Sequence, residues 1–530
     1  MKFRLLYKSV AVTAAIVLTA TSCTKNLDRT PYIQVTSASV FNNPANIRLA
    51  FVKLYAGLSL SGQDVTSSPD IAASDVGSNV YLRNYWEAQE LPTDEAIISW
   101  NDADLQQYHL MNWTYTNSFT RMMYNRIYLE VALCNEFLRQ TTSDKLSANG
   151  ITSDPNIANY RSEARYLRAL AYWHAIDLFG NVPFVTENDP VGSFFPPQTT
   201  RAELFKYVEK ELLDIQTSLP DARQNEYGRA DKACAWMLLA KLYLNAQVYT
   251  GTPRYSDVIT YCNKIISQGG YTLAANYANL FLTDSRNTNE IIFPIRANGL
   301  TSQSYGNTTF IIHAATGGSM DQATLGLKSG GWAGLRTTKT LVNLFPDPNG
   351  TTDKRAMFYT NGQTLDIAAV TDFSNGYTVT KFKNLSSTGV PGSDPSGNFV
   401  DTDFPMFRLG DVYLMYAEAA FKGGTGGSLA TAVTYINALR QRAYGNTSGN
   451  ITTADLSDDF FVAERGRELY WEGHRRTDLI RFNRFTPASY LWAWKGGVAA
   501  GTGVDAHYNL YPIPNTDLQA NPTLKQNAGY

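Results

Sequence analysis

Histidines and carboxylates are the residues that most often carry catalysis, and their spacing in this 530-residue chain does not indicate an enzyme. No two histidines stand four residues apart with a Glu between them, as they do in a zinc-binding helix. The five are widely separated: His109, His174, His313, His474 and His507. There is no Gly-x-Ser-x-Gly nucleophile elbow and no Gly-rich loop ending in Lys-Ser or Lys-Thr. We predict that the protein is not an enzyme.

Carboxylates leave one catalytic alternative open, because two of them at a suitable separation can hydrolyse a glycosidic bond. The chain has 47 Asp and Glu residues, yet no spacing singles out a pair. The Gly-rich stretch 423–428 joins two expected helices, so it is interpreted as a loop rather than a phosphate site. A surface glycoside hydrolase therefore remains the catalytic alternative.

Aromatic side chains among polar ones offer binding chemistry instead. A pyranose ring stacks its C–H face on Trp or Tyr, and its hydroxyls need Asn, Asp or Arg partners. Residues 61–114 combine both kinds in a segment whose pattern is broken by Gly, Ser, Asp and Asn. The residues concerned are Trp86, Trp100 and Trp113, with Arg83, Asn84, Asn101 and Asp102. Trp173, Trp236 and Trp471 lie on expected helix faces and are predicted to belong to the core.

Charge and composition favour a neutral ligand. The formal net charge is -2 and only 17% of residues are charged. Such a chain has no long-range positive potential that would attract nucleic acid. The aromatic content of 12%, with 32 Tyr, suits a contact surface or a Tyr-rich helical core equally well. We predict no nucleic-acid partner.

The elements that must position these residues are mainly helical. Residues 161–184 carry two adjacent apolar stripes at helical spacing, and Gly180 and Pro183 near the end of this stretch are stop signals. A helix packed on two sides is typical of stacked helical hairpins. Further helices are expected at 43–59 and 115–140, and hairpins at 229–267 and 409–443. The expected fold is all-α, a tetratricopeptide-like solenoid of about four degenerate helix pairs.

Residues 270–405 interrupt this helical pattern. They are rich in Gly, Thr, Asn and Ser, with short apolar runs at 290–295 and 310–314. We expect loops with a few short strands laid over the solenoid. A final stretch, 464–485, alternates Glu and Asp with Arg, pairing Glu464 with Arg467, Glu472 with Arg475 and Arg476, and Asp478 with Arg481. A buried, mutually neutralised network is favoured there over an anion or active site.

The N-terminus has the features of an exported, lipid-anchored protein. Lys2, Arg4 and Lys8 precede an apolar run too short to span a membrane, and small residues precede Cys23. The position of Cys23 resembles a lipobox, although Ala20 stands where Leu is usual. We predict that the remaining cysteines are buried as small hydrophobic residues: Cys134, Cys234 and Cys262. A disulfide between Cys234 and Cys262 is the alternative.

Several phrases together resemble the SusD/RagB family of Bacteroidetes surface lipoproteins. Arg168, Ala169, Tyr172, Gly180, Val182 and Pro183 fit one signature, and Trp332, Phe345, Asp353 and Arg355 fit another. Leu27, Asp28 and Pro31 open the mature chain, and residues 407–419, 464–485 and 511–530 follow the family almost residue by residue. The resemblance covers about 500 positions.

The resemblance implies a function. Such proteins capture an oligosaccharide or polysaccharide at the outer membrane and deliver it to a SusC-like TonB-dependent transporter. It implies glycan contacts at Arg83, Trp100, Asn101 and Asp102, with Tyr305 and Trp332 from later loops, although Trp332 has a structural alternative. Two further functions stay open from the sequence: binding of a peptide by the same class of lipoprotein, and service as a pure protein-interaction scaffold.

The chain is accordingly divided into four parts. Residues 1–22 are a signal peptide, 23–42 a lipidated tether that faces outward from the outer membrane, 43–275 an N-terminal helical part with binding loops, and 276–530 a C-terminal part with loop insertions and closing helices. No cofactor and no metal ligands are predicted; structural calcium in the loops is an alternative.

Overall fold

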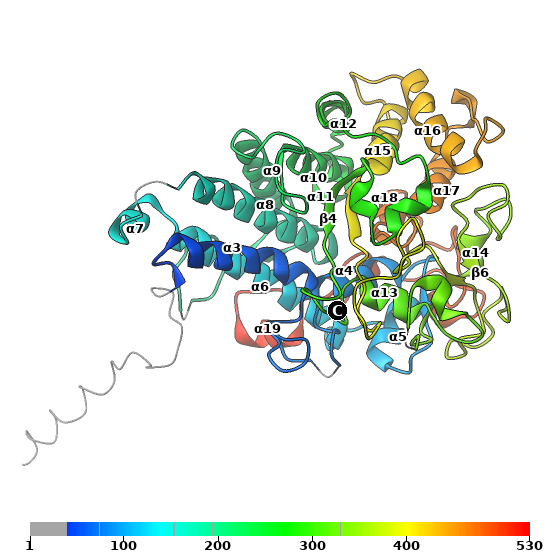
Figure 1. Ribbon diagram of the computed structural model, residues 1–530, viewed down its shortest axis with the longest axis horizontal. Coiled ribbons are helices and arrows are strands. Elements are labelled where there is room, and N and C mark those ends of the chain that lie inside the picture. Colours follow the sequence, from blue (N-terminus) through cyan, green and yellow to red (C-terminus); the bar gives the residue numbers. More distant parts are fainter. Residues whose placement is uncertain (1–39, 74, 152–153, 193, 329) are drawn as a thin grey trace, which may run out of the picture.

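The computed structural model describes residues 40–73, 75–151, 154–192, 194–328 and 330–530 (Figure 1). The predicted signal peptide, Cys23 and nearly all of the tether lie outside these residues. The described chain is mostly helical with only short strands, as predicted.

The N-terminal helices form where the sequence predicts them. α3 (Pro44–Ser59) begins at Asn43, whose side chain accepts a hydrogen bond from the Asn46 amide at 2.9 Å, and it has Pro at its first position. α6 (Ser118–Gln140) and α8 (Pro155–Leu178) pack closely together. α8 is buried on nearly every side from Ala164 onward, and the left-handed Gly180 follows its end.

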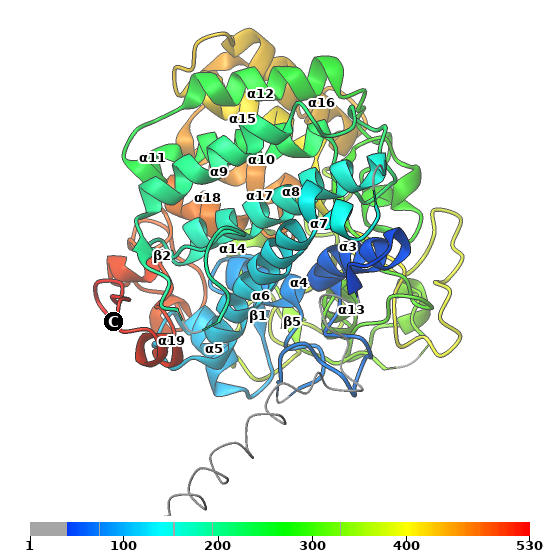
Figure 2. The ribbon, with the colours of Figure 1, turned by 90° about the vertical axis from the view of Figure 1, so that its left-hand side faces the viewer.

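The remaining helices continue the stack in chain order. α8 contacts α9 (Arg201–Ile215), which contacts α10 (Lys232–Leu244); α10 pairs with α12 (Tyr255–Gln268) across the short α11 (Ala246–Thr250). α12 packs on α15 (Leu409–Phe421), which pairs with α16 (Leu429–Tyr444). Figure 2 shows α12, α15 and α16 at the top, α9 and α10 beneath them, and α8 and α6 below. The two predicted hairpins and the solenoid are confirmed.

The charge-dense stretch forms a buried network between α17 (Asp458–Leu469) and α18 (Arg475–Arg481) and their neighbours, as predicted. Arg408 binds Glu290, Glu468 and Glu472 at 2.6–2.9 Å. The expected pairing of Glu472 with Arg475 and Arg476 is wrong, however, because the chain turns between the two helices through left-handed Trp471 and Gly473. Arg475 binds Asp94 instead, and Arg476 binds Asp177.

Residues 61–114 are more regular than predicted. They include α4 (Tyr81–Glu90) and α5 (Ala103–Leu110), separated by β1 (Ile97–Ile98). Every residue of α4 is buried, so the helix has no solvent-exposed face. Buried polar residues such as Asn84 and Gln89 hide its apolar helical period in the sequence. α18 packs on it from the C-terminal part.

The region 270–405 has the predicted loops and short strands, with one correction. The run 290–295 forms β4 (Ile291–Ile295), antiparallel to β8 (Phe404–Arg408). The run 310–314 is not a strand but lies in α13 (Thr308–Ala314), capped by the Asn307 side chain. The other pairs are β1 with β5 (Leu335–Arg336), β2 (Val182–Pro183) with β3 (Gln198–Thr199), and β6 (Phe358–Tyr359) with β7 (Thr378–Val379).

Short helices complete the chain: α7 (Ser143–Ala148), α14 (Lys339–Val342) and α19 (Asn515–Ala520), and the 3-10 turns η1 (Tyr277–Phe281), η2 (Ser285–Asn287), η3 (Gln322–Leu325), η4 (Thr453–Asp455), η5 (Lys495–Gly497) and η6 (Ala506–Asn509). Within the described ranges, no helix is both long enough and apolar enough to cross a membrane.

The three cysteines that the structure describes are all buried and free. Cys134, Cys234 and Cys262 behave as small apolar side chains, which confirms that prediction. The alternative of a Cys234–Cys262 bridge is wrong; the Cys234 thiol instead donates to the Ile292 carbonyl at 3.4 Å.

Candidate functional site

An open cavity of about 440 Å³ collects most of the predicted site residues. It is lined by Asp75, Val76, Arg83, Trp100, Asp102, Tyr305 and Trp332. Five of the six predicted contacts are therefore brought together from three distant stretches of chain. The sixth, Asn101, is exposed between two lining residues but does not itself line the cavity.

The pairing of β1 with β5 places the two tryptophans side by side. Ile98 lies opposite Leu335, so Trp100 follows one strand where Trp332 precedes the other. The Trp100 indole N–H donates to the Trp332 carbonyl at 2.9 Å, and the ring centroids are 6.4 Å apart. The backbone of Trp332 is in turn held by the end of α13, since its amide donates to His313 O at 2.7 Å. The Trp100 ring and the Trp332 backbone are thus held in place.

Tyr305 completes an arc of three rings. Its centroid lies 6.1 Å from Trp332 and 4.8 Å from Phe399. The chain here is packed against Gly77, which has a φ of +93°; a Cβ there would come within 2.6 Å of the Tyr305 backbone. Glycine is therefore required for Tyr305 to reach the cavity.

Arg83 forms the base of the cavity. It projects from α4 and is 3% exposed, with its guanidinium 4.4 Å from the Phe310 ring centroid and 5.6 Å from that of Trp100. It donates to Glu87 at 2.8 Å and to Asp75 at 3.1 Å. Burial raises the pKa of Glu87 to about 7, although Arg83 opposes the shift.

This arrangement is suited to binding a ring-shaped polar ligand. Three aromatic faces border one opening, and Arg83, Asp75 and Asp102 supply hydrogen-bonding groups beside them. Asp75 is 63% exposed and Asp102 is exposed, so both carboxylates can reach a ligand in the opening. Stacking and charge-assisted hydrogen bonds then act on the same molecule.

Three residues of the predicted aromatic segment are not part of this site. Trp86 and Trp113 are fully buried; their indole N–H groups donate to Trp471 O at 3.0 Å and Tyr530 Oη at 2.6 Å. The Asn84 amide donates to the carbonyls of Ser78 and Val80 inside the fold. Trp173, Trp236 and Trp471 are buried, as predicted.

Sequence reasoning missed four residues at this site. Asp75 and Val76 line the opening, Phe310 lies beneath Arg83, and His313 stacks on Trp332 with centroids 4.9 Å apart. The last two belong to the run 310–314, whose apolar pattern did not show that it forms a helix under the site. No motif marks Asp75 and Val76. Among the described residues, no three His, Cys, Asp or Glu side chains gather in a way that could hold a metal ion.

Models of related protein families match both halves of the chain. Residues 60–244 match the family model described as "Starch-binding associating with outer membrane", and residues 358–530 match that of the SusD family. Solved structures share the fold. One is surface glycan-binding protein A from Bacteroides thetaiotaomicron, in complex with laminarihexaose. It superposes with a TM-score of 0.69 at 20% sequence identity, and the match covers 91% of this chain and 99% of that one. A SusD superfamily protein from Parabacteroides distasonis gives 0.70 at 20% identity, covering 94% and 100%.

Curated relatives extend the likeness to the full length. SusD-like protein P25 of Formosa agariphila is 25% identical over 99% of both chains. The starch-binding protein SusD of Bacteroides thetaiotaomicron is 34% identical over 98% of both chains. The chain therefore belongs to the SusD family.

Proposed function

We propose that this protein captures a neutral oligosaccharide at the cell surface and passes it to a SusC-like TonB-dependent transporter. The observation that carries the proposal is the arc of Trp100, Tyr305 and Trp332 around one open cavity, with Arg83 at its base. A full-length relative named as starch-binding and a fold neighbour that holds laminarihexaose support a glucan as ligand.

The charges of the cavity support a neutral ligand. Arg83 is already paired with Glu87 and Asp75, while Asp102 adds a second exposed carboxylate. An anionic ligand would meet this negative charge, whereas hydroxyls can donate to it. We propose that the protein acts by binding and release and breaks no bond, which the relatives named as starch-binding and glycan-binding support.

We also propose that the protein is anchored in the outer membrane by acylation of Cys23 and faces outward. The family description links this chain to the outer membrane, and the basic and apolar N-terminal pattern ending at Cys23 supports export and lipidation. This location supports the proposed delivery to a transporter.

A calorimetric titration of the protein lacking residues 1–22 and Cys23 tests the function. Maltohexaose and laminarihexaose are the probes, with a mixed peptide pool as the alternative cargo. We expect one of the glucans to bind and Trp332→Ala or Trp100→Ala to weaken that binding at least about tenfold, because each removes a stacking face.

Phe195→Ala is the matched control, since Phe195 is an exposed ring away from the cavity. It should bind as the unmodified protein does, and circular dichroism should show that all variants are folded. Binding only of peptide, release of reducing ends from either glucan, or full affinity in the Trp332→Ala variant would each contradict the proposal.

A further inference from the structure

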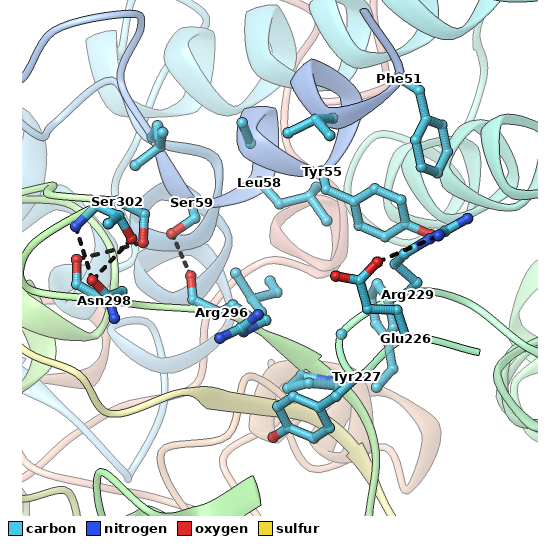
Figure 3. A pocket seen from close by; sticks show the side chains of 18 of the residues that line it. Phe51, Tyr55, Leu58, Ser59, Glu226, Tyr227, Arg229, Arg296, Asn298 and Ser302 are labelled. Carbon is cyan, nitrogen blue, oxygen red and sulfur yellow. Dashed lines mark hydrogen bonds and ion pairs between the residues drawn. The ribbon is translucent and has the colours of Figure 1, made fainter. Parts of the chain in front are cut away.

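A second cavity, which shares no lining residue with the first, lies beside α3. Its volume is about 350 Å³. Its walls are α3 from Arg48 onward, the loop at 226–229, the end of β4 and the turn at 298–302 (Figure 3). This volume lies within the range of small-ligand pockets, and mostly apolar side chains line it.

The aromatic walls of this cavity are held rigidly. The Tyr55 hydroxyl donates to Glu163 Oε2 at 2.6 Å and accepts from the Ala230 amide at 2.9 Å. The Tyr227 hydroxyl donates to Asp403 at 3.1 Å. Both hydroxyls are therefore committed to protein partners, and the rings are held in place on opposite walls (Figure 3). Rings fixed in this way lose little entropy when a flat ligand stacks on them.

The charge of the lining is positive. It contains Arg48, Arg229 and Arg296 against the single carboxylate of Glu226. Arg229 is neutralised, since it binds Glu163 at 2.5 Å and lies 3.5 Å from Glu226. Arg48 and Arg296 are exposed, and neither forms an ion pair with any residue that the structure describes.

The two free guanidinium groups are placed to act on a ligand in the cavity. Arg296 extends over the Tyr227 ring, 5.7 Å from its centroid, so a cation and an aromatic face are presented together (Figure 3). The buried Asp403 carboxylate interacts electrostatically with Arg296 but is already hydrogen-bonded by the Ala297 amide and the Tyr227 hydroxyl. The Arg296 guanidinium is therefore available for a ligand carboxylate.

A polar rim supplies partners for hydroxyls. The Asn298 side-chain oxygen accepts from the Leu300 and Thr301 amides, which orients the group, while its Nδ2 donates to no described residue. Ser302 and the Thr301 hydroxyl stand in the same turn. A purely apolar acid would leave these groups unused, whereas a sugar would engage them.

We propose that this cavity is a second binding site, specific for an acidic sugar residue that carries a carboxylate on a pyranose ring. The ring stacks between Tyr55 and Tyr227, the carboxylate binds Arg48 and Arg296, and the ring hydroxyls bind the turn at 298–302. The site thus complements the first cavity, where Asp75 and Asp102 oppose an anion, and it lets one chain hold a glycan that has both neutral and acidic units.

Calorimetry with trigalacturonate at low ionic strength tests the assignment in the protein lacking residues 1–22 and Cys23. We expect saturable binding that weakens as salt is added, and at least about tenfold weaker binding in the Arg48→Gln/Arg296→Gln double variant. Both arginines are exposed and unpaired, so this variant should fold normally. Arg121→Gln/Lys525→Gln, which removes two other exposed positive charges, is the charge-matched control and should retain full affinity.

Testing each variant against both ligands distinguishes the two sites. Trp332→Ala should lower glucan affinity and leave trigalacturonate binding intact, and the double variant should do the reverse; a failure of the glucan arm alone therefore affects only the first site. Equal binding of the uncharged trimethyl ester, equal binding of phenylacetate, or no binding of trigalacturonate at low salt would each overturn the proposal. The same holds if the double variant retains full trigalacturonate affinity.

Discussion

Glu130 shows how burial decides the protonation of a single residue. It lies on α6 and is 2% exposed, and burial raises the pKa of its carboxyl to about 8. Arg126 and Lys53 oppose the shift without cancelling it, and the Cys134 thiol donates to the carboxyl at 3.6 Å. At neutral pH the folded protein therefore keeps a proton on Glu130 that the unfolded chain releases.

This proton makes stability depend on pH. Because the pKa is higher in the folded state than in the unfolded state, Glu130 favours folding fully at low pH, and that contribution is lost as pH rises from about 4.5 to 8. We predict that Glu130→Gln flattens this dependence. The quantity to compare is the fall in the free energy of unfolding when the pH is raised from 5 to 8. This fall should be smaller in the variant than in the unmodified protein, by on the order of 3 kcal/mol. Urea unfolding at both pH values measures it.

The control for this prediction is Glu203→Gln on α9, a carboxyl that is 60% exposed. We expect this variant to leave the pH dependence unchanged, because the side chain lies on the surface. Parallel pH curves for Glu130→Gln and the unmodified protein would show that Glu130 is ionised in the fold.

The sequence predicted several of the residues that line the candidate site. Trp332 was identified through a phrase shared with a family, and Trp100 through its place in the aromatic and polar segment 61–114. The two are 232 residues apart along the chain, and only the β1–β5 pairing places them together. Trp86 and Trp113 have the same residue type in the same segment but are core residues. Composition cannot separate the two pairs, because burial depends on long-range packing such as that of Trp86 on Trp471.

Among the elements, α17 and α18 show why ion pairs were harder to predict than helices. The alternation of charges correctly indicated a neutralised network. Its partners were partly wrong because helical spacing was assumed across residues 470–474, where left-handed Trp471 and Gly473 change the chain direction. Glu472 consequently faces Lys381 and Arg408 from other parts of the fold.

Arg408 joins several elements through this network. At the end of β8 it binds Glu290, which precedes β4, and Glu468 on α17, as well as Glu472. Arg408→Lys keeps the charge but cannot reproduce the planar fork of donors. We predict a loss of on the order of 2–3 kcal/mol in unfolding free energy, because buried carboxylate oxygens would lose hydrogen bonds.

Arg484→Lys provides the comparison, since the Arg484–Asp459 pair is exposed. Urea midpoints at pH 7 should show almost no change for this variant, as expected of a surface ion pair. An equally small change for Arg408→Lys would contradict the prediction. Water or rearranged side chains would then have to donate hydrogen bonds to the carboxylates, and the network would not be the rigid link between β8 and α17 that the distances indicate.

The whole molecule combines a nearly neutral surface with two cavities of opposite local charge. Its formal net charge is -2, yet acidic groups border the first cavity and unpaired arginines border the second. The helical stack holds both cavities at fixed positions, since α3 lies against α6 and α8 while α13 lies against α4. The predicted solenoid was recovered because its helices repeat an apolar pattern; the loops over it have no such pattern and could be placed only by the structure.

The proposed anchoring concerns the whole molecule and should be separable from binding. Acylation contributes about 0.8 kcal/mol per buried methylene, and more than one chain gives stable membrane attachment. Cys23→Ala removes the proposed acylation site, so we predict that the protein leaves the outer-membrane fraction, as measured by fractionation of cells and immunoblotting. Its affinity for a glucan should not change, because both cavities are formed by residues from 48 onward. Retention of the Cys23→Ala protein in the outer membrane would mean that contact with the transporter, rather than lipid, holds it there.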